Sequence, residues 1–464
     1  MDATVDTKSR QATGKALAAR DALRDSFGVW THVSVAGIGG PAKQIATMHR
    51  LAVEGKRWIS EDGFFHALSY CIALPGPETQ QLAIYVGWLA NRTIGGIIAG
   101  GLFILPGAIC MMALSFGYVL GAESQAGQAI FVGVRPAILA IMAEAIVRFG
   151  RHVLHGPLML AVAALAFLAA FFKLPLPLII FVPALLGIAA AMARLPGFTR
   201  PAAATTDRAA GAHKREGLAD HARPGIAQLA RSLAIWLALW LAPAITLFAI
   251  FGMDNIYTQI SLAFGKVALM AFGGDYAVVV YGAKQAVDSY HWISTREVQE
   301  GIAMGEIVPG TIMIVTQFFG FVAAYRDPGN LPPLLAGVFG GLLATWMTFI
   351  PCFLWILSIA PFIEGLRRKA ILSNALQAVT AAAVGVIFNL TVWFGIRTLF
   401  RVVQPVQYGQ LNFDVPDFAS FDPWALALFA CAAIAVFRFQ ISAAMTLVAS
   451  SAAGILLLWV GLAG

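Results

Sequence analysis

The sequence predicts an all-α polytopic membrane protein in which two homologous units form an inverted repeat of about 13 membrane segments. The 464 residues are 59% hydrophobic and only 12% charged, whereas soluble domains are about a quarter charged. Long apolar stretches recur along the chain, and a set of Gly, Trp and Pro residues recurs 234 positions later. These features together indicate a membrane protein that arose by duplication.

Stretches of about 18 or more apolar residues predict membrane spans. Such stretches occupy residues 94–120, 128–147, 153–172, 174–193, 232–252, 331–359, 371–396, 422–437 and 441–462. Residues 1–26 are polar and of mixed charge, which favours a cytoplasmic tail, and no cleavable signal peptide is evident. The polar, basic stretch 194–231 predicts a disordered cytoplasmic linker between an N-terminal unit at 27–193 and a C-terminal unit at 232–464.

Two short apolar segments in the first unit decide how the chain crosses the membrane. If 27–47 and 64–90 each cross, the chain has 13 crossings, with the N-terminus inside and the C-terminus outside. That arrangement places Arg50, Lys56 and Arg57 outside, against the preference of basic loops for the cytoplasm. We therefore favour re-entrant hairpins for both segments, which keep the same orientation. In either case, the extra segment 232–252 makes the second unit start from the opposite side.

The duplicated motif contains two breaks in each unit. The pairs Gly39-Gly40 and Gly273-Gly274 interrupt the first segment, and Pro75-Gly76-Pro77 and Pro309-Gly310-Thr311 interrupt the second. Residues 39–76 and 273–310 share 9 identities in 38. A helix that restarts after a Pro-Gly break presents unpaired N–H groups and a positive dipole end, which favour an anion. A proline kink is the simpler interpretation of one copy, but two copies in register predict a shared anion site.

Few polar side chains lie within these apolar segments, and each is a candidate for function. Lys43 and Lys266 are the best candidates for buried positive charge, whereas Arg50, Lys56, Arg57 and Lys284 fit snorkelling to the interface. Glu78, Asp275 and Glu306 flank the breaks, where protonation of a carboxylate couples H⁺ to anion movement. Hydrogen-bond donors to an oxyanion are expected from Gln80, Gln81, Thr311 and Gln317.

Other classes of protein find little support in the sequence. Nucleotide, zinc-hydrolase and serine-hydrolase motifs are missing from the sequence, so we expect no cofactor and no enzyme activity. The cysteines Cys71, Cys110, Cys352 and Cys431 stand singly without metal-ligand spacing, which indicates packing residues. The formal charge of +7 reflects membrane loops rather than nucleic-acid binding. A membrane enzyme acting on a lipid or metal ion is the alternative class, and the sequence leaves a homodimer open.

Several short motifs, in order, resemble the chromate transporter family. They are Gly39-Gly40-Pro41-Ala42-Lys43-Gln44-Ile45, Met48-His49-Arg50, Lys56-Arg57-Trp58-Ile59-Ser60-Glu61, Leu74-Pro75-Gly76-Pro77-Glu78 and Gly100-Gly101-Leu102-Phe103-Ile104-Leu105-Pro106-Gly107. The second copy of the motif resembles the long, two-domain members. The resemblance implies an inner-membrane carrier that exports chromate and confers resistance to it, with sulfate as a competing oxyanion. Uptake or exchange of sulfate or molybdate by the same architecture is the alternative.

Overall fold

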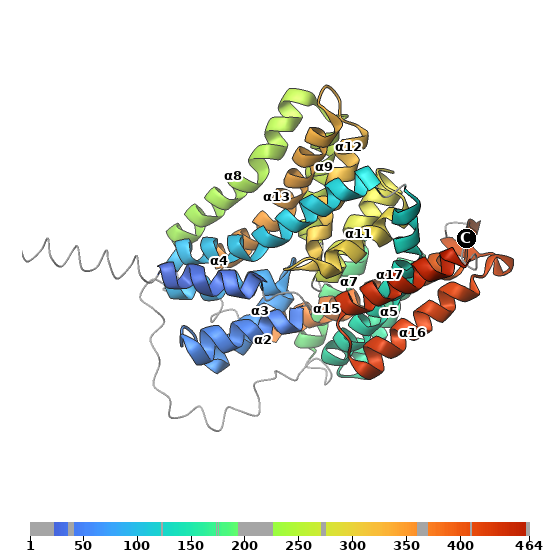
Figure 1. The fold of residues 1–464 in the computed structure, drawn as a ribbon. Helices are drawn as coiled ribbons and strands as arrows, with labels where there is room; N and C mark the ends of the chain where they lie inside the picture. Colours follow the sequence, from blue (N-terminus) through green and yellow to red (C-terminus); the bar gives the residue numbers. More distant parts are fainter. Residues whose placement is uncertain are drawn as a thin grey trace, which may run out of the picture.

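The computed structural model describes residues 23–35, 41–121, 124–172, 174, 176–193, 226–270, 275–359, 370–408 and 411–460. Most of these residues are helical (Figure 1), as the sequence predicts. The predicted tail and the predicted linker fall largely outside this set, and so do Gly39, Gly40, Gly273 and Gly274.

The first unit begins with a helix over residues 23–35. Its other helices are α2 (Pro41–His49), the π-helix η1 (Arg50–Gly55), α3 (Glu61–Ala73), α4 (Glu78–Gly121), α5 (Gln125–Val153), α6 (Pro157–Phe171) and α7 (Leu176–Met192). The second unit contains α8 (Ile226–Phe251), α9 (Ile256–Met270), α10 (Asp275–Lys284), the π-helix η3 (Gln285–Ser289), α11 (Thr295–Ile307), η4 (Ile312–Ile314), α12 (Val315–Arg326), α13 (Pro333–Ile359), α15 (Ala370–Leu399), α16 (Pro423–Phe439) and α17 (Ala443–Trp459).

Helix α4 is a helical hairpin rather than one rod of 44 residues. Asn91 and Arg92 have non-helical backbone angles, with φ of 55° at Arg92. A Cβ placed on Gly87 would lie 2.6 Å from the Cβ of Ala99, although twelve residues of straight helix span about 18 Å. The chain therefore reverses at Asn91–Arg92, and arms 78–90 and 93–121 pack closely through small residues.

The second unit repeats this hairpin with a longer turn between α12 and α13. A Cβ on Gly320 would lie 2.5 Å from the Cβ of Ala344 and 2.7 Å from the carbonyl oxygen of Gly340. In the first hairpin, a Cβ on Gly87 would meet the carbonyl oxygen of Gly95 at 2.5 Å. Each hairpin is thus held by a glycine on its first arm that fits a Gly-xxx-Ala pair on its second arm.

The duplication also holds at the level of the backbone. The left-handed residues Arg57 (φ 53°) and His291 (φ 55°) are 234 positions apart, and so are Gly76 (φ 110°) and Gly310 (φ 109°). The π-helices η1 and η3 occupy matching positions, and Ser60 and Ser294 cap α3 and α11 in the same way. Two short stretches of backbone therefore fold alike even though few of their side chains agree.

The second Pro-Gly hairpin enters and leaves at the same end. Arg326, the last residue of α12, forms an ion pair with Glu297 in the first turn of α11. Each arm of 13 residues, such as α3 or α11, spans about 20 Å, which is short of the roughly 30 Å core of a bilayer. Lys56, just after η1, lies 2.6 Å from Asp25 in the helix 23–35, so this first pair of helices also closes at one end. These contacts favour re-entrant hairpins over full crossings.

The two units are inverted relative to each other. The first Pro-Gly hairpin opens at the turn Asn91–Arg92, and arm 93–121 leads away from that turn. Near the far end of this arm, about 38 Å along the helix, Tyr118 donates a hydrogen bond to Glu300 at the mouth of the second hairpin. The two hairpins therefore open at opposite ends of the molecule, which is the inverted repeat that the sequence predicts.

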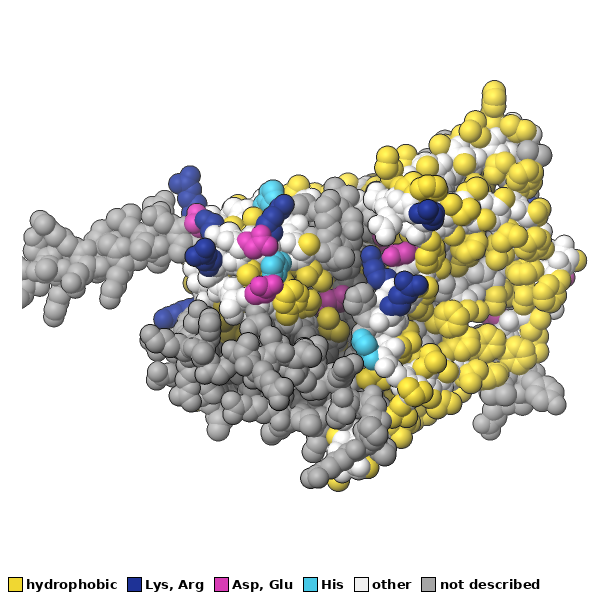
Figure 2. All heavy atoms as spheres, turned by 90° about the horizontal axis from the view of Figure 1, so that it is seen from below, with side chains coloured by type: hydrophobic (Ala, Val, Ile, Leu, Met, Phe, Trp, Pro, Cys, Tyr) yellow, Lys and Arg dark blue, Asp and Glu magenta, His cyan; other side chains and the backbone are white. Residues whose placement is uncertain are grey.

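Within the described residues, four helices are long and apolar enough to cross a membrane: Glu78–Gly121, Ala227–Phe251, Pro333–Ile359 and Gln377–Leu399. In the first of these, arm 93–121 is the part long enough to do so. Figure 2 shows a broad hydrophobic surface on which charged side chains gather in a few groups. Large side chains such as Leu185, Ile250 and Val448 are exposed over several helices, as expected for a surface that faces lipid.

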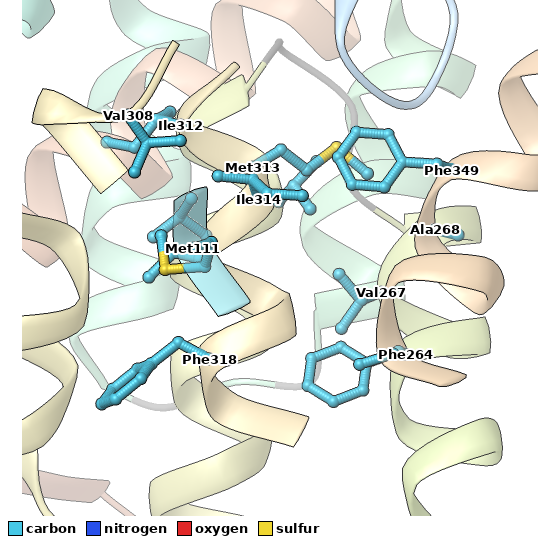
Figure 3. Close-up of a cluster of buried hydrophobic side chains, with 14 of the residues drawn as sticks. Met111, Phe264, Val267, Ala268, Val308, Ile312, Met313, Ile314, Phe318 and Phe349 are labelled. Carbon is cyan, nitrogen blue, oxygen red and sulfur yellow. The ribbon is translucent and has the colours of Figure 1, made fainter. Parts of the chain in front are cut away.

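The core lies around the second break, where helices of both units meet (Figure 3). Val308, Ile312, Met313 and Ile314 are buried together with Met111 of α4. Phe264 and Val267 of α9, Phe318 of α12 and Phe349 of α13 complete this cluster. The residues that follow the break, 311–314, are thus enclosed, whereas Pro309 and Gly310 are half-buried.

The remaining helices pack beside this core. Helices α16 and α17 lie along α5, and α15 lies against α6 and α7 (Figure 1). A feature that the sequence did not predict is the antiparallel hairpin of β1 (Val403–Tyr408) and β2 (Leu411–Pro416). It lies between α15 and α16, and Arg397 pairs with Asp414 there at 2.7 Å.

Candidate functional site

The first Pro-Gly break joins α3 to the first arm of α4. Leu74 ends α3 in an extended conformation, and the left-handed Gly76 follows Pro75. Proline lacks an amide hydrogen, and a φ of 110° suits glycine because it has no Cβ. The side-chain amide of Gln81 donates to the carbonyl oxygen of Pro75 at 2.7 Å and so fixes the turn. The new helix therefore begins at Glu78, inside the protein.

The second break joins α11 to η4 and α12 with the same geometry. Val308 is extended, and Gly310 has a φ of 109°. Thr311 caps the new helix by accepting a hydrogen bond from the amide of Met313 at 3.1 Å. The carbonyl oxygen of Gly310 accepts from the side-chain amide of Gln44 on α2. A residue of the first unit thus supports the break of the second unit.

Each break also packs on the long helix of the opposite unit. A Cβ on Gly107 of α4 would lie 2.5 Å from the carbonyl oxygen of Pro309, and a Cβ on Gly76 would lie 3.0 Å from the sulfur of Cys352 on α13. Helices α4 and α13 cross where Gly100 meets the ring of Phe353. Gly107, which contacts the second break, is seven residues from Gly100 on α4, and Cys352, which contacts the first break, is next to Phe353 on α13. Both breaks therefore lie within about 12 Å of the crossing.

Buried polar side chains follow the first break. Thr79 and Gln80 are fully buried, and among the described residues neither the hydroxyl of Thr79 nor the two amide atoms of Gln80 have a hydrogen-bond partner. Buried polar groups in proteins are nearly always hydrogen-bonded, so unpartnered ones indicate a ligand, ion or water. They lie in the first helical turn, where backbone N–H groups also lack intrahelical acceptors. This turn can donate hydrogen bonds to an anion.

The other predicted residues are placed as follows. Lys43 lies in α2 and Asp275 begins α10, but the placement of their side chains is outside the described set. Glu78 is the first residue of α4, directly after the first break, and Glu306 lies near the end of α11, before the second. Gln317 of α12 donates to the carbonyl oxygen of Ala108 on α4 at 2.9 Å, which makes it a link between the units.

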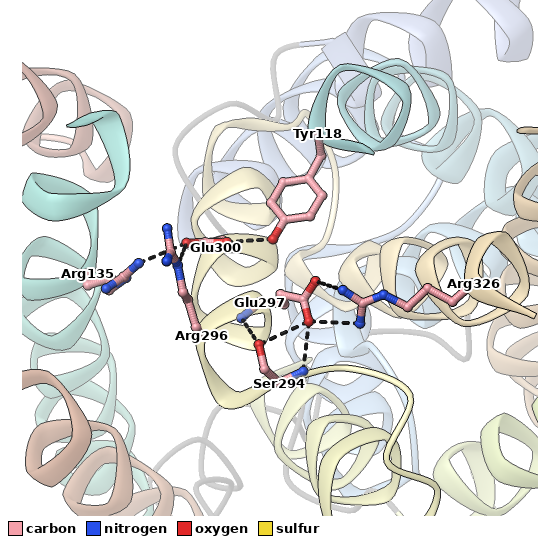
Figure 4. A network of polar contacts seen from close by, with 7 residues as sticks. All are labelled: Tyr118, Arg135, Ser294, Arg296, Glu297, Glu300 and Arg326. Carbon is pink, nitrogen blue, oxygen red and sulfur yellow. Dashed lines mark hydrogen bonds and ion pairs between the residues drawn. The ribbon is translucent and has the colours of Figure 1, made fainter. Parts of the chain in front are cut away.

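A second polar centre, which the sequence analysis missed, lies at the mouth of the second hairpin (Figure 4). The side chain of Glu300 is only 2% exposed. One of its carboxylate oxygens forms ion pairs with Arg135 at 3.0 Å and with Arg296 at 2.8 Å. Its other oxygen accepts from the hydroxyl of Tyr118 at 2.6 Å. This network joins α4 and α5 of the first unit to α11 of the second.

Beside it, Glu297 forms a bidentate pair with Arg326 (Figure 4). Glu297 also completes a capping box with Ser294, whose hydroxyl accepts from the Glu297 amide. Ser294-x-x-Glu297 is a helix-start signature that was visible in the sequence. Arg135, an ionisable residue inside the apolar stretch 128–147, was a second visible signal.

These two networks line a cavity of about 780 Å³. It has room for about 25 water molecules at about 30 Å³ each. A smaller cavity of about 60 Å³ lies on the other side of η3 and is lined by Lys284, Asp288, Asn389 and Asp414 among others. The residues of the two Pro-Gly breaks line neither of these cavities.

An inverted helical repeat with broken hairpins at its centre is an architecture of membrane transporters. Comparison with known proteins agrees, because the family model of the chromate transporters matches residues 24–188 and 258–456. The chain therefore belongs to the chromate transporter family.

Three relatives illustrate the range of the family. The chain is 27% identical over 402 residues to a chromate transport protein of Pseudomonas aeruginosa, with 85% of this chain and 86% of that protein covered. It is 25% identical over 398 residues to a chromate transport protein of Cupriavidus metallidurans, with 82% and 84% covered. An uncharacterised transporter of Bacillus subtilis, YwrB, is 29% identical over 133 residues, or 29% of this chain and 68% of YwrB. No solved structure matches the chain.

Proposed function

We propose that this chain is a secondary transporter that exports chromate across the inner, plasma membrane and so confers chromate resistance. The observation that carries the proposal is the pair of Pro-Gly breaks, which share one backbone conformation and lie beside the crossing of α4 and α13. The names of the relatives in Pseudomonas and Cupriavidus support chromate as the substrate.

The proposed anion site consists of the breaks and their neighbours. Chromate is a tetrahedral dianion, and helix starts combine free N–H groups with a positive dipole end. The buried amide of Gln80 can donate to an oxyanion without losing an existing partner, because it has none among the residues that the structure describes. The full set comprises Gly39, Gly40, Lys43, Pro75, Gly76, Pro77, Gln80, Gly273, Gly274, Pro309, Gly310 and Thr311.

The proposed coupling groups are Glu78, Asp275 and Glu306. Glu78 directly follows the first break, so its negative charge opposes an anion bound at the same helix start. Protonation removes that repulsion, which links anion binding to proton binding. Transport driven by an ion gradient or the membrane potential follows from this linkage.

The orientation follows from the charges at the two ends. One end holds Lys56, Arg57 and Arg92 at the mouths of the first unit's hairpins, and Arg148 and Arg151 near the end of α5. Near the opposite end, the loops 252–255 and 327–332 hold Asp254 and Asp327, and the neighbouring Arg326 is offset by Glu297. Basic loops favour the cytoplasm, so we place the first hairpins inside, with the N-terminus cytoplasmic and the C-terminus outside. This placement removes the conflict that full crossings create for Arg50, Lys56 and Arg57.

Flux in everted membrane vesicles tests the proposal. Vesicles energised by respiration should accumulate chromate when they contain the wild-type protein, and collapse of the proton gradient should stop it. Lys43→Ala and Glu78→Ala should abolish accumulation while the protein still reaches the membrane. Arg148→Gln is the matched control, because Arg148 pairs with Glu144 at 3.7 Å, away from both breaks.

Other outcomes separate the alternatives. Uptake of sulfate or molybdate into right-side-out vesicles, without chromate accumulation in everted ones, would reverse the direction and the substrate. Loss of Cr(VI) with conservation of total chromium would identify a reductase. Wild-type flux in both variants would remove Lys43 and Glu78 from the proposed site.

A further inference from the structure

The charged side chains at the mouth of the second hairpin hold an excess of positive charge. The lining of the cavity is itself balanced, with two arginines and two glutamates, and Arg135 adds a further guanidinium that contacts the lining residue Glu300. Glu297 and Arg326 neutralise each other in a bidentate pair and also stabilise the start of α11. Two guanidinium groups, those of Arg135 and Arg296, remain for the one carboxylate of Glu300. The side chains that converge on Glu300 therefore hold one more positive charge than negative charge.

These two arginines have hydrogen-bonding capacity left over. Each contacts Glu300 through a single nitrogen, Nη2 of Arg135 and Nε of Arg296. A guanidinium carries five N–H donors, and the Nε of Arg135 is buried with no partner in the part of the chain that the structure describes. Since an unpaired buried donor is costly and rare, this atom indicates that a further acceptor binds here.

The cavity also gives an anion access to the arginines that contact Glu300. Arg296 and Glu300 line the cavity of about 780 Å³, and Arg135 reaches Glu300 from α5. The volume admits a small oxyanion with much of its hydration shell. Glu300 precedes Val308 by eight residues of α11, so the network lies about 12 Å from the second break.

We propose that this cavity is an anion vestibule on the path to or from the break at Pro309–Gly310. In it, a small dianionic oxyanion replaces Glu300 as the ion-pair partner of Arg135 and Arg296. Arg135 belongs to the first unit and Glu300 to the second, so the exchange also releases a bridge between the units. The role in transport rests on the proposed function, whereas the binding of a dianion does not.

Protection of an introduced cysteine tests the vestibule in the full-length protein. Thr295→Cys places a thiol on the cavity wall, in a background of Cys110→Ser and Cys431→Ser, which removes the exposed native thiols. The probe is sulfate, with chloride at equal ionic strength as the control anion. Sulfate should slow alkylation of the thiol by a maleimide, and half-maximal protection reports the affinity.

The decisive readout is the sign of two charge changes. Arg135→Gln removes a cation and should weaken protection about tenfold, whereas Glu300→Gln removes the competing anion and should strengthen it about tenfold. A network with a purely structural role would respond to both changes with a loss of stability and no opposite shifts. Arg135→Lys keeps the charge and should retain most of the protection, which guards against a folding defect in Arg135→Gln.

Arg148→Gln, the same change on the same helix α5 but near its other end, should leave protection unchanged. Equal shifts in Arg135→Gln and Glu300→Gln, or no protection in any variant, would overturn the vestibule. Protection without chromate flux in the wild-type protein would retain the vestibule and reject the proposed function. Chromate flux without protection would reject the vestibule and retain the proposed function.

Discussion

Replacement of the two left-handed glycines by alanine tests the breaks at the centre of the fold. Gly76 and Gly310 share a φ near 110°, which costs a residue with a side chain about 1–3 kcal/mol. At Gly310 the nearest atom to a new Cβ is the carbonyl oxygen of Phe103 at 3.4 Å, an ordinary contact. Gly310→Ala should therefore lower the free energy of unfolding by about 1–3 kcal/mol, from backbone strain alone.

Gly76→Ala adds steric overlap to the same strain. Its Cβ would lie 3.0 Å from the sulfur of Cys352 and from the side-chain nitrogen of Gln81. Both are side chains that can shift, so the overlap should add about 1 kcal/mol, the low end for overpacking. Gly76→Ala should thus be the less stable of the two, and a double-mutant cycle with Cys352→Ala should recover part of the overlap as coupling, because the contact with Gln81 remains.

The free energy of unfolding can be measured by titration of the detergent-solubilised protein with SDS, and chromate flux can be measured in parallel vesicles. Gly101→Ala is the control, because nothing lies within 4 Å of its Cβ and it sits in a helical arm. That change should be neutral or stabilising by up to about 1 kcal/mol. If Gly76→Ala and Gly310→Ala behaved like Gly101→Ala, the left-handed breaks would be wrong, and the anion site built on them would fall.

Three further predictions concern the hairpins and the buried amide. Gly87→Ala and Gly320→Ala should each destabilise the protein by about 1–3 kcal/mol relative to Gly101→Ala, because their Cβ atoms would overlap the facing arm; equal stability in the SDS titration would contradict the close-packed hairpins. Gln80→Leu should leave the free energy of unfolding unchanged or raise it, since the amide has no partner to lose among the described residues. The same change should increase the KM for chromate flux. A loss of stability with normal flux would give Gln80 a structural role. Arg92 and Asp327 lie at exposed turns of the two hairpins. In a background of Cys110→Ser and Cys431→Ser, Arg92→Cys and Asp327→Cys should react with an impermeant maleimide from opposite sides of the membrane. Labelling of both from one side would exclude the inverted repeat.

The sequence predicted the helical class and the duplication well because both depend on local chemistry. Apolar stretches of membrane length and a Gly-Trp-Pro pattern at a spacing of 234 residues are legible without any contact. The ion pair of Glu144 with Arg148, four residues apart on α5, depends only on local spacing. By contrast, the contacts of Gly96 and Gly100 with Leu357 and Phe353 of α13 depend on the fold.

The network around Glu300 was missed because its members come from distant parts of the chain. Tyr118 and Arg135 lie 182 and 165 residues from Glu300. Glu300 stands in the most polar stretch of α11, Thr295–Glu300, where a carboxylate suggests exposure rather than burial. The hairpin β1–β2 was missed for a related reason, because a two-stranded pair of six residues each gives a weak local signal.

By itself the sequence determined that the chain is helical, lies in a membrane and carries two copies of one broken motif, since composition and periodicity report local preference directly. The tertiary structure alone decided that α4 folds back at Asn91–Arg92, that the hairpins open at opposite ends, and that each break rests on the long helix of the other unit. Those features depend on which small residues meet across the interior, and such contacts are set by packing of the whole chain rather than by any one segment.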